Sequence, residues 1–199
     1  MVRCLALILS IAVYAAPAGA NFHLWEATEI FSNADGSIQF VEFFTEFAGQ
    51  QVLIGHSLET YQQNVMRKQF SFLTSIPLPQ GGTTANHHFL VATPGFIAAA
   101  GIAPDYEIPV GFLEPGIIDE VAIVGSDDMN FAASALPTDG VNSLNDPGSG
   151  GLLFAAAATP TNFAGDIGTI VPEPGAGLVG IVAIACLALL SRRVAPTAG

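Results

Sequence analysis

The chain has little cysteine, and the cysteine it has lies near its ends. The 199 residues include two cysteines, Cys4 and Cys186, each inside a strongly apolar segment. The region between these segments therefore has neither a disulfide nor a thiol nucleophile. Its stability must come from the burial of apolar side chains, for which a single domain of about 130 to 150 residues is large enough.

Positive charge is also scarce. Five Lys and Arg stand against 17 Asp and Glu, which gives a net charge of −12. Because Arg3, Arg192 and Arg193 lie at the ends, the body keeps two basic residues against seventeen acidic ones, a net charge of −15. Binding to nucleic acid or to an anionic membrane needs clustered Lys and Arg, so the composition argues against both. It suits a soluble extracellular protein, or one that attracts divalent cations.

The amino end has the pattern of a secretory signal peptide. Arg3 is followed by an almost wholly apolar run to Ala16, and small residues follow as far as Ala20. Ala18 and Ala20 fit the small-residue pattern that signal peptidase cleaves, and the apolar run is shorter than a membrane span. We expect residues 1–20 to be removed and the mature chain to begin at Asn21.

The carboxyl end has a second apolar segment. The sixteen residues 175–190 contain no charged or strongly polar side chain. As a helix they would measure roughly 24 Å, somewhat less than the roughly 30 Å hydrocarbon core of a bilayer. A buried core helix is the alternative, but an amphipathic helix should have a polar face. Arg192 and Arg193 follow directly, as the positive-inside rule expects. The pattern predicts one transmembrane helix over 175–190, with the body outside the membrane.

The order of elements at this end resembles the PEP-CTERM sorting signal of exported bacterial proteins. A Val-Pro-Glu-Pro element, the apolar span and the arginines follow one another between Val171 and Arg193. The resemblance implies a sorting signal over 171–199, cut near Pro-Glu-Pro by the membrane transpeptidase exosortase in a bacterium that makes extracellular polysaccharide. It makes Arg192 and Arg193 the stop signal. The implied recognition residues are Pro172, Glu173 and Pro174.

The body between these signals has the pattern of short strands. Apolar and β-branched runs alternate with Pro and Gly turns, and Asp35-Gly36 between two such runs is a strong hairpin signal. Both faces of 37–47 are largely apolar, which predicts a central strand. One short helix is expected, over 95–101. The pattern predicts a mainly β fold, an immunoglobulin-like β-sandwich over residues 21–134. Strands are expected over 22–31, 37–47, 51–54, 68–73, 88–92 and 120–124.

A second resemblance concerns this body. The strand-like run Phe40-Val41-Glu42-Phe43 after a turn, a Gly-Leu region at 55–58 and the run 89–93 are similar to lamin-tail-like domains. The similarity extends over about residues 26–124. It implies an immunoglobulin-like sandwich of the kind found on bacterial surface proteins, and it implies little about activity, since such folds have many roles.

Residues 135–170 are rich in Pro, Gly, Asn and Ser, which predicts a loop or stalk between the body and the sorting signal. Four oxygen-bearing side chains in it could bind Ca²⁺, which prefers carboxylate and amide oxygens on flexible loops. Their spacing differs from that of the twelve-residue calcium loop, so solvated turns are the alternative. No other cofactor is expected. These candidate ligands are Asp139, Asn142, Asn145 and Asp146.

No motif in the body indicates catalysis. His87 and His88 are adjacent, and neighbouring side chains on a strand point to opposite faces. Glu42 is expected to face out or to pair. Neither a Gly-x-Ser-x-Gly element nor a phosphate loop is present.

The sequence thus predicts an exported, non-enzymatic cell-envelope or matrix protein. We expect a transient anchor in the inner membrane, processing by exosortase and association with extracellular polysaccharide. Two alternatives stay open. One is a secreted hydrolase with carboxylates such as Glu42 and Asp105 as acid and base, which needs the two carboxyls roughly 5–10 Å apart. The other is a structural protein that is anchored permanently.

Overall fold

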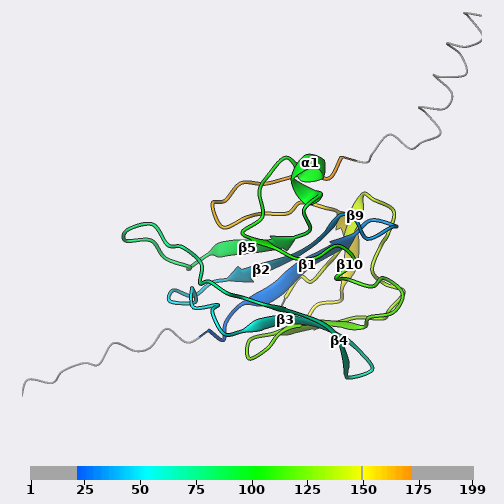
Figure 1. Cartoon of the computed structure of the whole chain (residues 1–199), viewed down its shortest axis with the longest axis horizontal. Helices are drawn as coiled ribbons and strands as arrows, with labels where there is room; N and C mark the ends of the chain where they lie inside the picture. Colours follow the sequence, from blue (N-terminus) through cyan, green and yellow to red (C-terminus); the bar gives the residue numbers. More distant parts are fainter. Residues whose placement is uncertain (1–21, 149, 172–199) are drawn as a thin grey trace, which may run out of the picture.

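The structure, a computed structural model, describes residues 22–148 and 150–171. Almost all of its regular elements are strands, which form two sheets (Figure 1). The prediction of a mainly β fold is therefore confirmed. The cleavage residues Ala18 and Ala20, the Pro-Glu-Pro element, the apolar span 175–190 and the two arginines after it lie outside the described residues. Within the described parts, no helix has the length and apolar character needed to cross a membrane.

The larger sheet has six strands in the order β10-β9-β1-β2-β5-β6. All neighbours are antiparallel except β5 and β6, which run parallel. β2 lies between β1 and β5, as the apolar character of both its faces predicts. The strands are β1 (Glu26–Ser32), β2 (Gln39–Thr45), β5 (His87–Ala92), β6 (Tyr106–Glu107), β9 (Asn142–Asn145) and β10 (Phe154–Ala157).

The smaller sheet has four antiparallel strands in the order β4-β3-β7-β8 and packs against one face of the larger sheet. Side chains from both sheets meet there, as in the edge-to-face contact of Phe72 and Phe89, whose ring centroids are 6.2 Å apart. Trp25 is fully buried in this inner core, and its Nε1 donates to the carbonyl oxygen of Gln50 at 2.8 Å. The strands are β3 (Ser57–Gln62), β4 (Val65–Ser71), β7 (Glu120–Ile123) and β8 (Asp128–Asn130).

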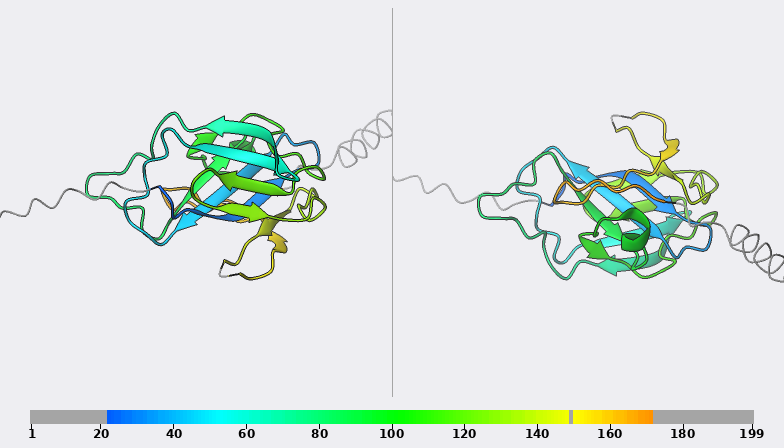
Figure 2. Two further views of the ribbon diagram at one scale, coloured as in Figure 1. Left: turned by 90° about the horizontal axis from the view of Figure 1, so that it is seen from below. Right: turned by 90° about the horizontal axis from the view of Figure 1, so that it is seen from above.

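The opposite face of the larger sheet carries a second apolar cluster. Phe31 and Phe40 stack on it with ring centroids 5.4 Å apart. The short helix α1 (Phe96–Ala100) and residues 158–171, which we call the strap, cover this outer face (Figure 2). Strand β2 is therefore buried on both faces. The smaller sheet covers one face, and α1 and the strap cover the other.

The β1–β2 hairpin forms where the sequence predicts it. Gly36 has a φ of +71°, and its N–H donates to the carbonyl oxygen of Asn33 at 3.2 Å. Residues 51–54 belong to the described part of the chain, and they do not form the expected strand; the chain turns there instead. β3 lies a few residues later, in a stretch whose polar composition hides its inward-facing Leu58 and Thr60.

The prediction of a loop or stalk over 135–170, with a folded body that ends at 134, is wrong. β9 pairs with β1 in the register Glu29↔Asn145 and Ile30↔Leu144, and Leu144 lies in the inner core. The strap covers the outer face of the same sheet. Small and polar residues fold here because the neighbouring strand supplies hydrogen bonds and the covered face supplies apolar contacts. The folded unit therefore includes residues up to 171.

Candidate functional site

Two glutamates lie side by side beneath the strap. Glu29 on β1 and Glu42 on β2 are directly opposite each other in the antiparallel register. Their exposed fractions are 3% and 4%, so both carboxylates are almost fully removed from water. Burial of an ionised carboxylate is costly unless hydrogen bonds or opposite charges compensate it. The surroundings of these two groups therefore decide what the site can do.

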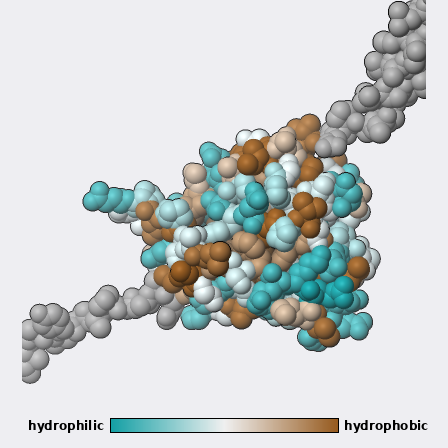
Figure 3. All heavy atoms as spheres, viewed as in Figure 1, coloured by the Kyte–Doolittle hydropathy of each residue, from teal (hydrophilic) through white to brown (hydrophobic). Residues whose placement is uncertain are grey.

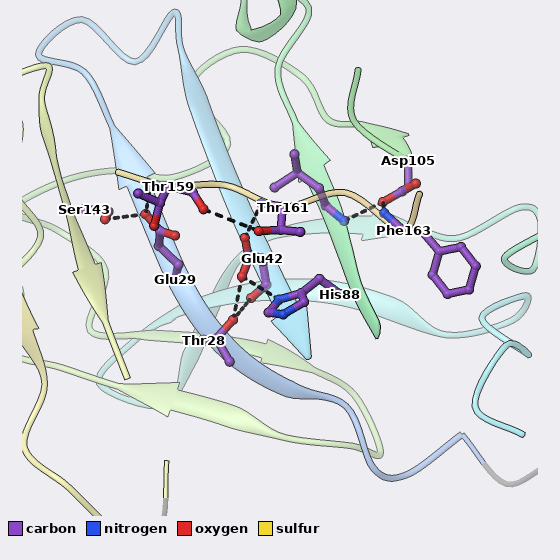
Figure 4. A network of polar contacts seen from close by, with 10 residues as sticks. Thr28, Glu29, Glu42, His88, Asp105, Ser143, Thr159, Thr161 and Phe163 are labelled. Carbon is purple, nitrogen blue, oxygen red and sulfur yellow. Dashed lines mark hydrogen bonds and ion pairs between the residues drawn. The ribbon is translucent and has the colours of Figure 1, made fainter. Parts of the chain in front are cut away.

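The strap supplies a row of hydrogen bonds to the carboxylates (Figure 4). The N–H of Thr159 donates to Glu29 Oε1 at 3.0 Å, and the N–H of Thr161 donates to Glu42 Oε2 at 2.5 Å. The N–H of Phe163 continues the row and donates to Asp105 Oδ2 at 2.9 Å. These donors are two residues apart, because in an extended chain every second residue points to the same side.

Each of the two glutamates has further partners from the sheet. Ser143 on β9 donates its hydroxyl to Glu29 Oε1 at 2.5 Å. Thr28 donates its hydroxyl to Glu42 Oε1 at 3.3 Å, and His88 Nδ1 lies 2.7 Å from the same oxygen. The imidazole of His88 is thus the ring partner of Glu42, and hydroxyl and backbone N–H groups supply the other hydrogen bonds to the two carboxylates.

Burial raises the pKa of Glu29 to about 7, well above its ordinary 4.5. The hydrogen bonds from Ser143 and Thr159 oppose this rise, and the neighbouring charge of Glu42 adds to it. Burial also raises the pKa of Asp105, against the hydrogen bonds from the N–H groups of Leu90 and Phe163. Glu29 therefore takes up or releases a proton near neutral pH.

The acid and base of the hydrolase alternative both belong to this row. Glu42 and Asp105 come from β2 and from the segment before β6, and each accepts a backbone N–H of the strap. The two adjacent histidines have different partners: His88 pairs with Glu42, while His87 stacks on Phe163 with ring centroids 4.9 Å apart. The arrangement clamps the strap onto the sheet through three carboxylates.

The structure does not bring the four candidate calcium ligands together. Asp139 accepts N–H groups of Val141 and Asn142 before β9 begins, and Asp146 accepts the N–H of Gly148 after β9 ends. Asn142 and Asn145 are three positions apart on the strand, about 10 Å at the usual rise per residue. Ligands of one Ca²⁺ lie 2.3–2.6 Å from the ion. Across residues 22–148 and 150–171, no group of three His, Cys, Asp or Glu is placed to hold a metal ion.

No protein-family profile, curated protein or solved structure matches this chain. Function must therefore be argued from the chain itself.

The sequence left open whether Glu42 would face out or pair; it is buried and paired, and the strap as its partner was missed. The donors from the strap are backbone N–H groups of Thr159, Thr161 and Phe163, which leave no side-chain signature. The available signal was a glutamate in the middle of an apolar strand, since a buried carboxylate must find donors somewhere in the fold.

Proposed function

We propose that the chain is an exported, non-enzymatic cell-envelope or extracellular-matrix protein that carries a PEP-CTERM sorting signal and is processed by exosortase. The observation that carries the proposal is the contact that holds Val171, the residue directly before the Pro-Glu-Pro element. The N–H of Val171 donates to the carbonyl oxygen of Ala99 at 3.1 Å, and Pro172-Glu173-Pro174 follows immediately in the sequence. The proposed recognition element thus follows directly on a residue that is bonded to helix α1 of the body.

We propose the immunoglobulin-like, lamin-tail-like architecture as the finer description of the body. Two antiparallel layers with a shared core support it, as does the hairpin that brings Phe40-Val41-Glu42-Phe43 into the centre of the larger sheet. Such domains serve mostly in binding and structure, which agrees with a protein of the envelope.

The hydrogen bonds that the buried carboxylates accept support a non-enzymatic role. A general acid or base must reach the proton of a substrate. Glu42 accepts hydrogen bonds from Thr28, from Thr161 and from the pairing with His88, and the strap lies over it. These groups hold the fold together. The hydrolase alternative would require the strap to leave the sheet before each reaction.

Association with extracellular polysaccharide is part of the proposal. A hollow of about 510 Å³ lies beside the strap. Its walls combine the stacked rings of His87 and Phe163 with the carboxylate of Asp105, which uses Oδ2 for both of its backbone hydrogen bonds. Ring faces and a carboxylate oxygen are suited to the C–H faces and hydroxyl groups of a sugar. The acidic body favours uncharged over anionic chains.

The test is the intact mass of the mature protein from its native host, measured separately in the membrane, surface and medium fractions. We expect loss of residues 1–20 and of the residues after the Pro-Glu-Pro element, with the body outside the inner membrane. Glu173→Ala should retain the full carboxyl end, and Asp166→Ala, a nearby acidic residue within the strap, should be processed normally.

An intact carboxyl end in the membrane fraction of the unaltered protein would refute processing by exosortase. It would favour the alternative of a permanently anchored structural protein. A chain that keeps its first 20 residues and stays inside the cell would refute export altogether.

A further inference from the structure

The end of the strap and helix α1 form one continuous surface. The N–H of Thr169 donates to the carbonyl oxygen of Ala100 at 3.3 Å, and that of Val171 to Ala99 at 3.1 Å. The two segments touch closely at Gly168, where a Cβ would lie 3.0 Å from the carbonyl oxygen of Ala100. We call the surface formed by residues 94–104 and 167–171 the exit face, because it includes Val171, the residue before the Pro-Glu-Pro element (Figure 1).

The exit face exposes large apolar side chains. Ile97 on α1 is 51% exposed, and Ile167 and Val171 on the strap are 70% and 66% exposed. Figure 3 shows apolar side chains at the top of the molecule, where Figure 1 places α1. Apolar groups gathered at one place on a soluble domain mark a contact surface.

The exit face is also uncharged. Residues 94–104 and 167–171 contain no charged side chain, although residues 22–171 include sixteen acidic and two basic residues. Acidic residues occur at its border: Asp166 precedes Ile167, and Asp35 and Asp139 line a hollow next to Val171. The surface around Val171 is thus uncharged although the body is strongly acidic.

The sequence leaves little room between this face and the proposed span. Three residues, Pro172 to Pro174, separate Val171 from the apolar segment that begins at Gly175. Four residue steps reach at most about 14 Å when fully extended. The headgroup layer on one side of a bilayer takes up roughly 5–8 Å of that distance. An anchored body must therefore lie at the membrane surface with its exit face toward the lipid.

We propose that the exit face docks on the surface of the bilayer for as long as the chain is anchored, with Ile97, Ile167 and Val171 in contact with the headgroup layer. This inference rests on the proposed span. The fitting partner is a zwitterionic lipid surface, because anionic headgroups would repel the acidic border. Docking would also hold the Pro-Glu-Pro element at the depth of a membrane-embedded protease.

The experiment places one fluorescent label on the chain from Asn21 to Gly199, reconstituted in phosphatidylcholine vesicles that contain headgroup-quencher lipid. Cys186→Ser removes the native thiol of this chain, and Ile97→Cys supplies the labelling position. The matched control is Met66→Cys on β4, since Met66 is also 51% exposed. We expect quenching at position 97 to be several-fold stronger than at position 66, and to weaken when phosphatidylglycerol replaces part of the phosphatidylcholine.

Two readouts separate the failure of docking from the failure of the anchor. Flotation with the vesicles and resistance to carbonate extraction report on the span, and their loss would refute the anchor in the proposed function. Stable flotation with equal quenching at the two positions would overturn the docking proposal alone. Equal melting temperatures of the two labelled variants exclude a difference caused by unfolding.

Discussion

At the scale of single residues, Glu29 is the clearest point of tension in the fold. Its carboxylate is 3% exposed, lies opposite a second glutamate and has no Lys or Arg partner among the described residues. Hydrogen bonds from Ser143 and Thr159 compensate it in part. The net effect of burial is a pKa raised to about 7, so the proton itself becomes a stabilising partner.

Stability should depend on pH through this residue. The folded state binds the Glu29 proton more tightly than the unfolded chain does. The resulting stabilisation is therefore complete below a pH of 4.5 and is lost as the pH rises through about 7. Glu29→Gln should remove this pH dependence. From acidic to mildly alkaline pH, the free energy of unfolding of the variant should rise by about 3 kcal/mol relative to that of the unaltered protein. Denaturant titrations across this range measure the free energy of unfolding.

The control for this prediction is Glu26→Gln, on the same strand but exposed. Its free energy of unfolding should follow that of the unaltered protein over the whole pH range. A Glu29→Gln variant that shows the same pH dependence as the unaltered protein would contradict the assignment of the proton to Glu29.

At the scale of elements, the strap is held by its backbone more than by its side chains. Thr161→Pro removes the N–H that donates to Glu42 Oε2 and leaves a buried carboxylate oxygen without that donor. Such a loss costs about 1–3 kcal/mol. Thr161→Ala keeps the N–H and changes a side chain whose hydroxyl makes one long hydrogen bond, to the carbonyl oxygen of Thr159. In denaturant titrations, we expect the free energy of unfolding of Thr161→Pro to be about 1–3 kcal/mol lower than that of Thr161→Ala.

Hydrogen exchange should locate the effect. In Thr161→Pro, the amides of residues 159 and 163 should exchange faster than in Thr161→Ala, because the row of hydrogen bonds to Glu29 and Asp105 is interrupted. Equal stability and equal exchange in the two variants would show that the row contributes nothing to holding the strap.

The same scale explains what the sequence could and could not predict. Strands β1, β2 and β5 carry runs of apolar residues bounded by turns, so local pattern was enough to find them and to place β2 in the centre. β9 has the sequence Asn-Ser-Leu-Asn, with one apolar residue, and its pairing with β1 spans more than 110 positions. No local pattern encodes such a partner, since strand formation depends on the neighbouring strand.

The candidate site was unpredictable for a related reason. Glu42 stood out because a glutamate in an apolar strand needs a partner. Its register with Glu29 depends on a bulge in the hairpin near Ala27, and its coverage depends on a segment whose composition is that of a loop. Sequence therefore singled out Glu42 and Asp105, missed Glu29, and mistook the strap that binds all three for a linker.

At the scale of the whole molecule, the boundary of the folded unit is testable. Residues 21–171 should unfold cooperatively, whereas residues 21–134 should show no cooperative thermal transition, because they lack β9 and the cover of the outer face. Residues 21–157 keep β9 and β10 and lose only the strap, so they should melt at a lower temperature than residues 21–171. Circular dichroism and calorimetry measure all three.

A cooperative transition of residues 21–134 at the temperature of the longer chain would contradict this boundary. It would restore the description of residues 135–170 as an appendage on a complete domain.

Because the strap follows the strands in the chain, it also packs onto the sheet after they have emerged. A chain that emerges amino end first presents β1, β2 and β5 early, while Thr159 reaches Glu29 across 130 positions. Until then, α1 alone covers the outer face, and Glu29 and Glu42 lack their donors from the strap. If the chain is exported as proposed, the body becomes fully stable only after residues 158–171 have crossed the membrane, when the proposed sorting element directly behind them has reached it.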